Sequence, residues 1–373
     1  MKKDTKVKDL EMRRALCCAA MFAGLAMAAV AAEKGLTRKV ADLTEPKVME
    51  LADGGVFRYR WHEPAEVKPG EKYPLVVLLH GAGERGTNNF AQLVWGGQPI
   101  ADWFQRKGQE FYFIAGQVPT GEQWVNVPWA SYGHSLPEQP SKSMAALIDL
   151  ISKVLASDRP VDHERVYATG ISMGGYGTWD LISRKTEWFA AAMPICGGGD
   201  VAQAPRLRDL PIWIHHGDCD DAVPVWRGRA MIAALRNAGS HVARYSEYPG
   251  CGHFSWGPAY GDPKNLDWFF GKRRLARPEW AEVERTPQGL IAPAKHFEAT
   301  FEFTVDGGET WHAGLARRVP GFPIRLVDGE VVESPPYSFN IHHDGKWSLT
   351  TKKDGRVVDL QYRNLKARPL PEF

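Results

Sequence analysis

Residues 165–184 read RVYATGISMGGYGTWDLISR, and this stretch decides the fold. We expect residues 165–169 to form a strand, followed by a glycine-rich turn and a helix that runs through residue 184. Between them, residues 170–174 make up a G-x-S-x-G pentapeptide with Ser172 at its centre. A strand, a sharp turn through a serine and a helix form a nucleophile elbow, which presents the serine hydroxyl at the end of a sheet.

A steric argument explains why the pentapeptide has two glycines. The turn leaves no room for Cβ atoms beside the serine, so only glycine fits there. A glycine-rich turn of a nucleotide-binding fold is the alternative interpretation. Neither a phosphate-loop lysine nor a G-x-G-x-x-G follows the first strand, which argues against it.

The flanking sequence alternates short apolar runs with longer amphipathic ones. Residues 73–80 are almost continuously apolar, as expected for a strand covered on both faces. Residues 143–156 carry apolar side chains at helical spacing. Further strands are expected at residues 57–61, 111–116, 189–195, 210–215 and 242–248, and further helices at residues 90–107, 226–237 and 265–272. This alternation predicts an α/β fold, a mostly parallel sheet with helices on both faces.

A serine hydroxyl needs a base that removes its proton, and the base needs an acid that orients it. His253 follows the last expected strand, and Asp220 follows the strand before it. The order Ser172, Asp220, His253 places three catalytic residue types after strand ends, where ligands of open α/β sheets bind. Asp218 and Asp221 are the rival acids, each with the alternative role of a turn former.

An acyl-transfer site also needs donors for an oxyanion, usually two backbone N–H groups. One is expected from Met173, the residue after the nucleophile. The other is expected from Ala82, in the HGAGERG loop of residues 80–86, although a plain glycine-rich turn is the alternative. Other histidines at strand ends are expected to pack locally, namely His80, His215 and His216.

Five segments of the chain carry a family resemblance: residues 80–86, 170–179, 193–199, 216–224 and 248–253. They resemble secreted bacterial esterases of the α/β-hydrolase superfamily, a group labelled predicted peptidases or phospholipases. This group is related to carbohydrate esterase family 1, which holds feruloyl and acetylxylan esterases, and to polyhydroxybutyrate depolymerases. The resemblance covers about residues 55–272. It implies an α/β-hydrolase fold and assigns the acid to Asp220, the aspartate of H-G-x-x-D-x-x-V-P, although Asp221 stands where proline is common.

The resemblance implies a serine carboxylic ester hydrolase that works through an acyl-enzyme, with no cofactor. Plant polysaccharide-linked esters, feruloyl or acetyl, are the expected substrates. A serine peptidase of the prolyl-oligopeptidase-like type is one alternative, since the same triad cleaves amides. A carbohydrate-binding protein with residual esterase activity is another, with Trp311, Tyr337 and Trp347 as a binding platform or as ordinary core residues.

Candidates for substrate contacts are less specific. Trp124, Trp129 and Trp256 lie in expected loops near the active edge, where aromatic faces suit a phenolic acyl group or a sugar ring. Core packing is the alternative for each tryptophan. Glu84 and Gln117 lie just after strands that face the same edge, so they are also candidates for binding substrate.

The N-terminus has the pattern of a targeting segment. Arg13 and Arg14 precede an apolar run over residues 15–32 that ends in small residues before Glu33. This predicts a cleaved signal peptide over residues 1–31, and hence a secreted or periplasmic protein with no stable membrane insertion. A membrane anchor is the alternative, but the run is barely long enough to span a bilayer.

Export bears on the cysteines, because an oxidising compartment allows disulfides. Cys196, Cys219 and Cys251 lie outside the expected signal peptide. Cys219 immediately precedes Asp220, and Cys251 lies two residues before His253, so we expect a Cys219–Cys251 disulfide that braces acid and base. No C-x-x-C occurs, which argues against a structural zinc site, and no metal is expected.

The remaining sequence suggests a second domain. Alternation from residue 297 onward and repeated Asp-Gly pairs, at 306–307, 328–329, 344–345 and 354–355, predict antiparallel hairpins. We expect a catalytic domain over residues 32–276, a linker over 277–295 and a small β-rich accessory domain over 296–373. The net charge of +2, with no basic run outside the N-terminus, argues against nucleic acid or an anionic membrane surface as partners and leaves a small-molecule or polysaccharide ester.

Overall fold

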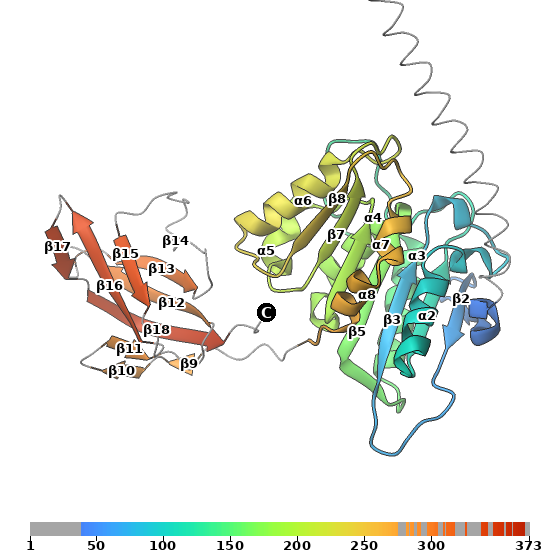
Figure 1. Cartoon of the computed structure of the whole chain (residues 1–373), viewed down its shortest axis with the longest axis horizontal. Coiled ribbons are helices and arrows are strands. Elements are labelled where there is room, and N and C mark those ends of the chain that lie inside the picture. The colour runs from blue at the N-terminus through green and yellow to red at the C-terminus, as the bar shows by residue number, and fades with distance from the viewer. Residues whose placement is uncertain are drawn as a thin grey trace, which may run out of the picture. The chain divides into compact units, whose positions relative to one another are not determined.

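The chain folds into two compact units, one that ends at Arg274 and one that begins at Leu275. The computed structural model (Figure 1) describes residues 39–274 and, from residue 281 to residue 369, the strands with a few residues beside them. The predicted signal peptide lies outside the described residues. Each unit is described by itself below.

The first unit is built on an eight-stranded sheet with the strand order β1-β2-β4-β3-β5-β6-β7-β8. Strand β2 pairs antiparallel with both β1 and β4, and all other neighbours are parallel. The strands are β1 (Glu45–Glu50), β2 (Val56–His62), β3 (Tyr73–Leu79), β4 (Tyr112–Gln117), β5 (Val161–Ile171), β6 (Ala191–Ile195), β7 (Trp213–Gly217) and β8 (Arg244–Tyr248).

Helices connect these strands. The α-helices are α2 (Gly97–Lys107), α3 (Lys142–Leu155), α4 (Met173–Arg184), α5 (Ala204–Leu207), α6 (Trp226–Asn237), α7 (Trp256–Gly261) and α8 (Pro263–Phe270). Short 3-10 turns are η1 (Ala82–Glu84), η2 (Ala91–Leu93), η3 (Thr186–Trp188) and η4 (Val201–Gln203). The predicted fold class, a mostly parallel sheet covered by helices, is confirmed.

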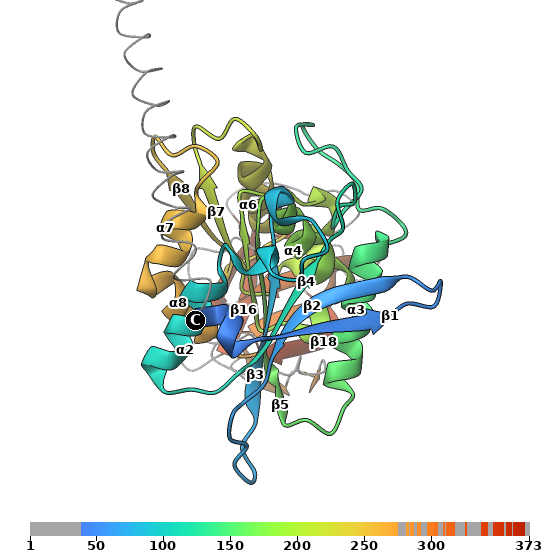
Figure 2. The same ribbon diagram turned by 90° about the vertical axis from the view of Figure 1, so that its right-hand side faces the viewer.

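Two hydrophobic cores form on the two faces of the sheet, because side chains alternate along each strand. On β3, Leu75, Val77 and Leu79 pack into the core that α3 and α4 share, while Val76 and Leu78 pack into the core of α2 and α8. Figure 2 shows α2, α7 and α8 on one side of the sheet and α3 on the other. Every residue of β3 is buried, as expected for a strand covered on both faces.

Some elements differ from the sequence-based expectation. The helix expected over residues 90–107 is split into η2 and α2, because Gly96 adopts a φ of 86° that a continuous helix does not allow. Strand β1 gave no apolar alternation to detect, since most of its side chains are exposed. Helix α7 was also not indicated by the sequence pattern, and it holds two glycines and a proline within its six residues.

The second unit contains only antiparallel strands among its described residues. Its two five-stranded sheets follow the orders β14-β13-β12-β18-β9 and β10-β11-β16-β15, with β17 on β16. The strands are β9 (Ala281–Glu282), β10 (Glu284–Thr286), β11 (Gly289–Ile291), β12 (Phe297–Thr304), β13 (His312–Arg317), β14 (Arg325–Leu326), β15 (Tyr337–Ile341), β16 (Lys346–Lys353), β17 (Arg356–Asp359) and β18 (Gln361–Pro369). The side chains of Tyr337 and Trp347, two members of the suggested binding platform, lie outside the described part.

The hairpins of this unit follow the Asp-Gly pairs. Strands β12–β13, β15–β16 and β16–β17 pair antiparallel across three of them. Within the first sheet, Glu298 on β12 forms a 2.9 Å ion pair with Arg368 on β18, and the Glu298 side chain is fully buried. The predicted small antiparallel β domain is thereby confirmed.

In the first unit, close backbone contacts fix the glycines on both sides of Ser172. A Cβ atom on Gly174 would lie 1.9 Å from the carbonyl oxygen of Leu79, and one on Gly170 would lie 2.4 Å from the carbonyl oxygen of Gly174. Because these are backbone atoms, α4 must move away from β3 before a methyl group fits. The steric reason inferred from the sequence is therefore confirmed.

Gly174→Ala is expected to lower the free energy of unfolding by about 3 kcal/mol, the upper end of the usual cost of overpacking. Urea denaturation of the isolated variant measures this loss. Gly83→Ala is the matched control, because a Cβ atom there meets nothing within 4 Å. Equal denaturation midpoints for the two variants would contradict the close approach of α4 to β3.

Candidate active site

Ser172 lies at the turn between β5 and α4 in a strained backbone conformation. Its φ is 53° and its ψ is −118°, which a residue with a Cβ atom rarely adopts. Its N–H donates to the carbonyl oxygen of Ile195 at the end of β6, at 2.9 Å. Ser172 thereby stands directly after the end of β5, at the edge where the parallel strands end.

Hydrogen bonds join Ser172, His253 and Asp220 into one chain. The Nε2 atom of His253 lies 2.8 Å from the Ser172 Oγ atom. Its Nδ1 atom lies 2.8 Å from Oδ2 and 2.9 Å from Oδ1 of Asp220. Since a carboxylate only accepts, Nδ1 carries the proton and Nε2 is left to accept from the serine hydroxyl. This is the arrangement in which an imidazole acts as a base.

Asp220 is held as a carboxylate by several donors. Its side chain is fully buried, and its Oδ1 atom accepts from the N–H groups of Ala222 and Val223 at 3.0 and 2.8 Å. The Nε2 atom of His216 lies 3.4 Å from Oδ2 and also donates to the Val223 carbonyl at 2.9 Å. Burial raises the pKa of Asp220, but the hydrogen bonds from His216 and His253 outweigh it and hold the pKa well below its usual range.

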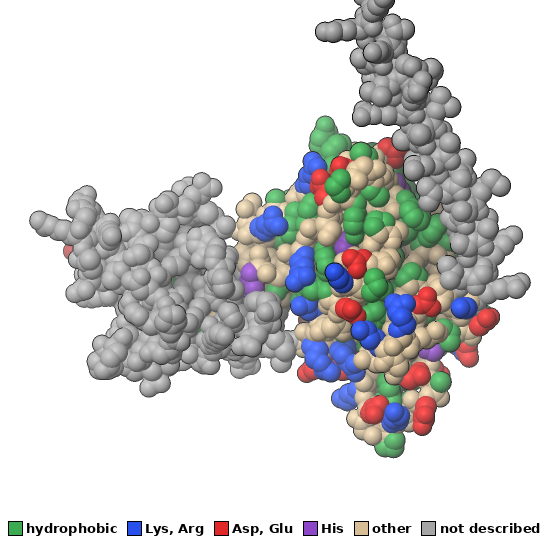
Figure 3. Space-filling view, in the orientation of Figure 1, with side chains coloured by type: hydrophobic (Ala, Val, Ile, Leu, Met, Phe, Trp, Pro, Cys, Tyr) green, Lys and Arg blue, Asp and Glu red, His purple; other side chains and the backbone are tan. Residues whose placement is uncertain are grey.

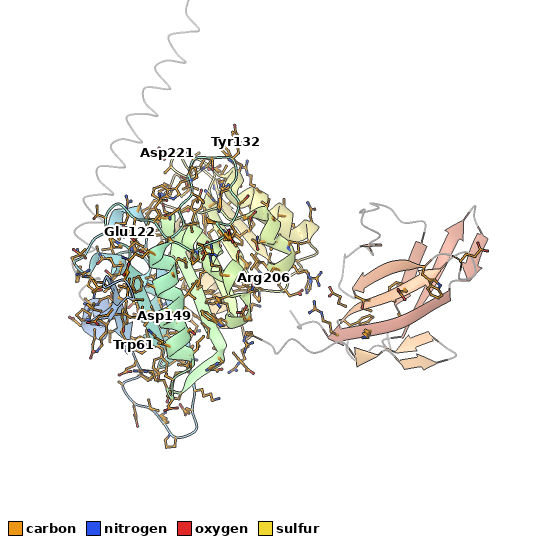
Figure 4. All side chains as sticks on the ribbon, turned by 180° about the vertical axis from the view of Figure 1, so that it is seen from behind. Trp61, Glu122, Tyr132, Asp149, Arg206 and Asp221 are labelled. Atoms are coloured by element: carbon orange, nitrogen blue, oxygen red, sulfur yellow. The ribbon has the colours of Figure 1, made fainter. Side chains whose placement is uncertain are left out.

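The two rival carboxylates have other positions. Asp218 accepts a 2.7 Å hydrogen bond from the N–H of Gly250 and so ties the loop of Asp220 to the loop of His253. Asp221 is exposed, and Figure 4 shows it at the outer end of the first unit. Of the three aspartates, the structure therefore brings Asp220 to the histidine. Apart from its place at a strand end, nothing in the sequence indicated that His216 lies against Asp220.

The expected oxyanion donors lie at two helix starts. Ala82 begins η1 and Met173 begins α4, and the first N–H groups of a helix have no intrahelical acceptor. The loop that carries Ala82 is held by His80, whose Nε2 atom accepts from the N–H of Val118 at 2.9 Å and whose Nδ1 atom donates to the carbonyl of Gly81. This pattern requires a neutral imidazole, and burial lowers the pKa of His80 to about 4.

The prediction that Trp124 contacts substrate is wrong. Its side chain is fully buried in the core. Its Nε1–H donates to the carbonyl oxygen of His80 at 3.1 Å, and its ring meets the His80 ring edge-on at 5.5 Å. Trp124 therefore supports the loop of the expected oxyanion donor from behind, where a substrate ring has no access.

Gln117 is also misassigned as a substrate contact, because both ends of its buried amide are already hydrogen-bonded within the protein. Its amide oxygen accepts from the N–H of Asn89 at 2.7 Å. Its amide nitrogen donates to the Glu84 carbonyl at 3.1 Å and to the Asn88 side chain at 2.8 Å. All of these partners lie in the segment after β3, so Gln117 fixes the shape of that segment.

Two predicted contact residues keep a position at the active edge. Glu84 ends η1, two residues after Ala82, and is half-buried. The Trp256 ring lies perpendicular to the His253 ring, with 5.4 Å between centroids. Trp95 and Phe254, which the sequence analysis missed, complete an aromatic cluster with Trp256 at centroid distances of 4.8–5.7 Å. Of these two residues, Phe254 could have been found from the sequence, because it directly follows His253.

The predicted Cys219–Cys251 disulfide is absent, because both side chains are thiols. A backbone hydrogen bond joins the two residues instead, from the N–H of Cys219 to the carbonyl oxygen of Cys251 at 2.9 Å. The Cys251 thiol points to the carbonyl of Gly252 at 3.5 Å. Backbone pairing and the Asp218–Gly250 hydrogen bond brace these loops without a covalent link.

A third thiol, Cys196, lies behind the hydrogen-bonded chain. Its sulfur, an oxygen of Asp220 and a nitrogen of His253 lie within 4.8 Å of one another, close enough to share a metal ion. Burial raises the pKa of the Cys196 thiol far above its usual range, so it stays protonated, while a metal ligand must be a thiolate. Asp220 and His253 are hydrogen-bonded to each other, so these three side chains fit a catalytic chain better than a metal site.

Acid is expected to destabilise the fold through His80. An unfolded histidine titrates near pH 6.5, while the folded His80 titrates near pH 4. The contribution of the neutral imidazole is complete above pH 6.5 and is lost as the pH falls to 4, a difference on the order of 3 kcal/mol. His80→Gln should therefore flatten the fall of the melting temperature between pH 6.5 and 4. The same slope in His80→Gln as in the exposed-residue control His163→Gln would contradict this.

Fold and site together define an α/β-hydrolase with a serine-centred site. More specifically, residues 64–263, over half of the chain, match the family described as Phospholipase/Carboxylesterase, and the chain belongs to this family. An uncharacterized secreted protein of Arthroderma benhamiae is 25% identical over 343 residues, which cover 81% of this chain and 33% of that protein. The poly(3-hydroxyoctanoate) depolymerase of Pseudomonas fluorescens is 27% identical over 241 residues, which cover 58% of this chain and 81% of that protein.

A solved structure, that of a thermostable esterase, is 36% identical with a TM-score of 0.57, and the match covers 63% of this chain and 64% of that one. The chain thus spans a third of the length of the Arthroderma relative and less than two thirds of the solved esterase. The resemblance to the α/β-hydrolase esterases is confirmed. Within the described residues, no helix has the length and apolar character needed to cross a membrane.

Proposed function

We propose that this protein is a serine carboxylic ester hydrolase with Ser172 as nucleophile, His253 as base and Asp220 as the acid that orients the base. The single observation that carries the proposal is the pair of 2.8 Å hydrogen bonds that His253 makes on its two sides. The family, whose description names carboxylesterases, supports the same reaction class.

The reaction follows from the positions of these atoms. His253 Nε2 takes the hydroxyl proton as Ser172 Oγ attacks the ester carbonyl, and Asp220 stabilises the imidazolium that forms. The N–H groups of Ala82 and Met173 receive the negative charge of the carbonyl oxygen. The imidazolium then gives its proton to the leaving alcohol, which leaves an acyl-enzyme. Water, deprotonated by the same imidazole, releases the acid and restores the serine.

For the substrate we propose esters attached to plant polysaccharides, with a feruloyl or an acetyl acyl group. The aromatic cluster of Trp95, Phe254 and Trp256 beside His253 supports this choice, because aromatic faces pack well against a phenolic or sugar ring. Basic and acidic side chains are interspersed on the face of the first unit in Figure 3, where no single-sign patch would attract nucleic acid.

We further propose that the protein is exported, with residues 1–31 as a cleaved signal peptide. The pattern of a charged start, an apolar run and small residues supports it. The name of the Arthroderma relative, a secreted protein, agrees. N-terminal sequencing of the protein recovered from outside the cytoplasm would show whether the chain begins near residue 32.

Ser172→Ala should lower kcat on esters by several orders of magnitude, because the acyl-enzyme cannot form. The assay compares methyl ferulate, acetylated xylan, short nitrophenyl esters and a peptide amide with wild type and variant. Hydrolysis of the amide faster than every ester would make the protein a peptidase instead. Near-normal ester turnover by Ser172→Ala would remove the serine from the mechanism.

Asp220→Asn should lower kcat by roughly 10⁴-fold, since the amide cannot hold the imidazole in the required tautomer. Its neighbour gives a matched control, because Asp221 is exposed and Asp221→Asn removes the same charge one residue away. Steady-state kinetics on a nitrophenyl ester separate the two. A loss in Asp221→Asn equal to that in Asp220→Asn would reassign the acid.

A further inference from the structure

A buried arginine near the candidate site has no acidic partner among the residues that the structure describes. Arg227, in the first turn of α6, is only 3% exposed, and its Nε–H is buried without a hydrogen-bond acceptor. Two other arginines of the first unit do have acidic partners, Arg229 on Glu247 at 2.6 Å and Arg184 on Asp180 at 2.8 Å. Among residues 39–274, no carboxylate forms an ion pair with Arg227.

The groups around the guanidinium are neutral. One Nη atom donates to Nδ1 of His134, and the guanidinium carbon lies 5.3 Å from the ring centroid of Tyr176. Burial, with repulsion from Arg227, lowers the pKa of His134 to about 4, so the imidazole accepts a hydrogen bond and adds no negative charge. Asp200 is the acid whose charge acts on His134. Its carboxylate accepts hydrogen bonds from the N–H groups of Leu136 and Ala202.

An arginine in proteins carries a permanent positive charge. Leaving such a charge buried without a counter-charge costs several kcal/mol. The cation–π contact with Tyr176 and the bond to His134 offset a part of this cost. The remaining deficit, together with the unused Nε–H, indicates an anion that is absent from the described chain.

This guanidinium packs against the first turn of α4, which begins directly after Ser172. The N–H of Tyr176 donates to the Ser172 carbonyl at 3.1 Å, so the ring that faces Arg227 is one helical turn from the nucleophile. Burial raises the pKa of the Tyr176 phenol, and the charges of Arg227 and Asp220 both act on it, which places the phenol within electrostatic reach of both. The Tyr176 ring therefore links the cation to the helical turn that carries the nucleophile.

An exposed aromatic pair, Tyr132 and Trp226, lies close in sequence to His134 and Arg227. Tyr132, two residues before His134, is 84% exposed and stacks on Trp226, the residue before Arg227, with 5.1 Å between centroids and 20° between planes. Figure 4 shows Tyr132 at the same end of the first unit as Asp221. Exposed aromatic faces of this kind pack against sugar rings.

We propose that Arg227, with His134, binds a carboxylate carried by the ester substrate, so that the enzyme prefers acidic esters to neutral ones of the same shape. This inference rests on the proposed esterase function. A guanidinium fits a carboxylate through two parallel N–H···O bonds, and the unused Nε–H is one of the five donors available for them. The carboxylate has two possible sources, an acyl group with a second acid function or a uronic acid in the alcohol part.

The first measurement compares wild-type kcat/KM on matched substrates. One arm uses 4-nitrophenyl hydrogen glutarate against 4-nitrophenyl valerate, which places the charge on the acyl side. The other arm uses acetylated glucuronate against acetylated glucose, which places it on the alcohol side. A preference of about 10-fold or more for the acidic member of one arm is expected, because hydrogen bonds to charged groups contribute about 1.5–3 kcal/mol.

Arg227→Gln should abolish this preference while the neutral ester is still hydrolysed, and Arg227→Lys should retain part of it. Gly198→Ala gives an independent variant, because a Cβ atom there would lie 2.4 Å from the Arg227 Nε atom and displace the side chain. Arg229→Gln, a cation two residues further along α6, is the control and should leave the preference unchanged. A structural role alone would lower both kcat/KM values equally.

Competition by a small acid needs no variant and covers the case in which Arg227→Gln does not fold. Glucuronate and glutarate should inhibit wild-type hydrolysis of the neutral ester at concentrations where glucose and glutaramide do not. Hydrolysis of neutral esters with no acidic preference in either arm and no such inhibition would overturn the carboxylate site and leave the proposed function intact.

If wild type hydrolyses none of the esters, the proposed function fails, and binding then decides the carboxylate site separately. Glucuronate or glutarate should raise the melting temperature of wild type and not that of Gly198→Ala. Equal shifts in both proteins, or none, would overturn the site.

Discussion

The close approach of α4 to β3 is the constraint on which the rest of the structure depends. Gly174 lies so near the carbonyl of Leu79 that a Cβ atom would be 1.9 Å away. The turn that leads into this contact has a φ of 53° at Ser172, and the contact places the start of α4 beside the loop that follows β3. The serine hydroxyl and the N–H groups of Ala82 and Met173 are brought to the same edge because the two backbones pack at this distance.

Two buried charged side chains in this unit, Asp220 and Arg227, have opposite kinds of surroundings. Asp220 receives hydrogen bonds from two backbone N–H groups and two histidines, so its negative charge is stabilised within the protein itself. Arg227 has a neutral imidazole and an aromatic face, and its Nε–H is unused. The surroundings of Asp220 suit a group that must stay charged to orient the base. Those of Arg227 suit a charge completed by a ligand, since a structural cation is usually paired.

The sequence predicted those features that depend on local order along the chain. The strand, turn and helix around Ser172, the parallel sheet and the small antiparallel unit follow from periodicity and glycine placement, and all three are present. The assignments of Trp124 and Gln117 failed because a place after a strand end does not fix which way a side chain points, and both point into the fold. The disulfide failed for a related reason, since nearness along the sequence to a contacting pair does not set the direction of two thiols.

By itself, the sequence determined the fold class, the elbow serine and a short set of acids and bases, because each needs a residue type at a fixed local spacing. The family resemblance pointed to Asp220, but only the tertiary structure showed that this aspartate meets His253 and that Trp124 supports the loop of Ala82. Only the tertiary structure, too, revealed that Arg227 is buried beside Tyr176 with no acid among the described residues. These features depend on contacts between segments far apart in the chain, whose geometry is set by packing on the sheet and has no signature in local sequence.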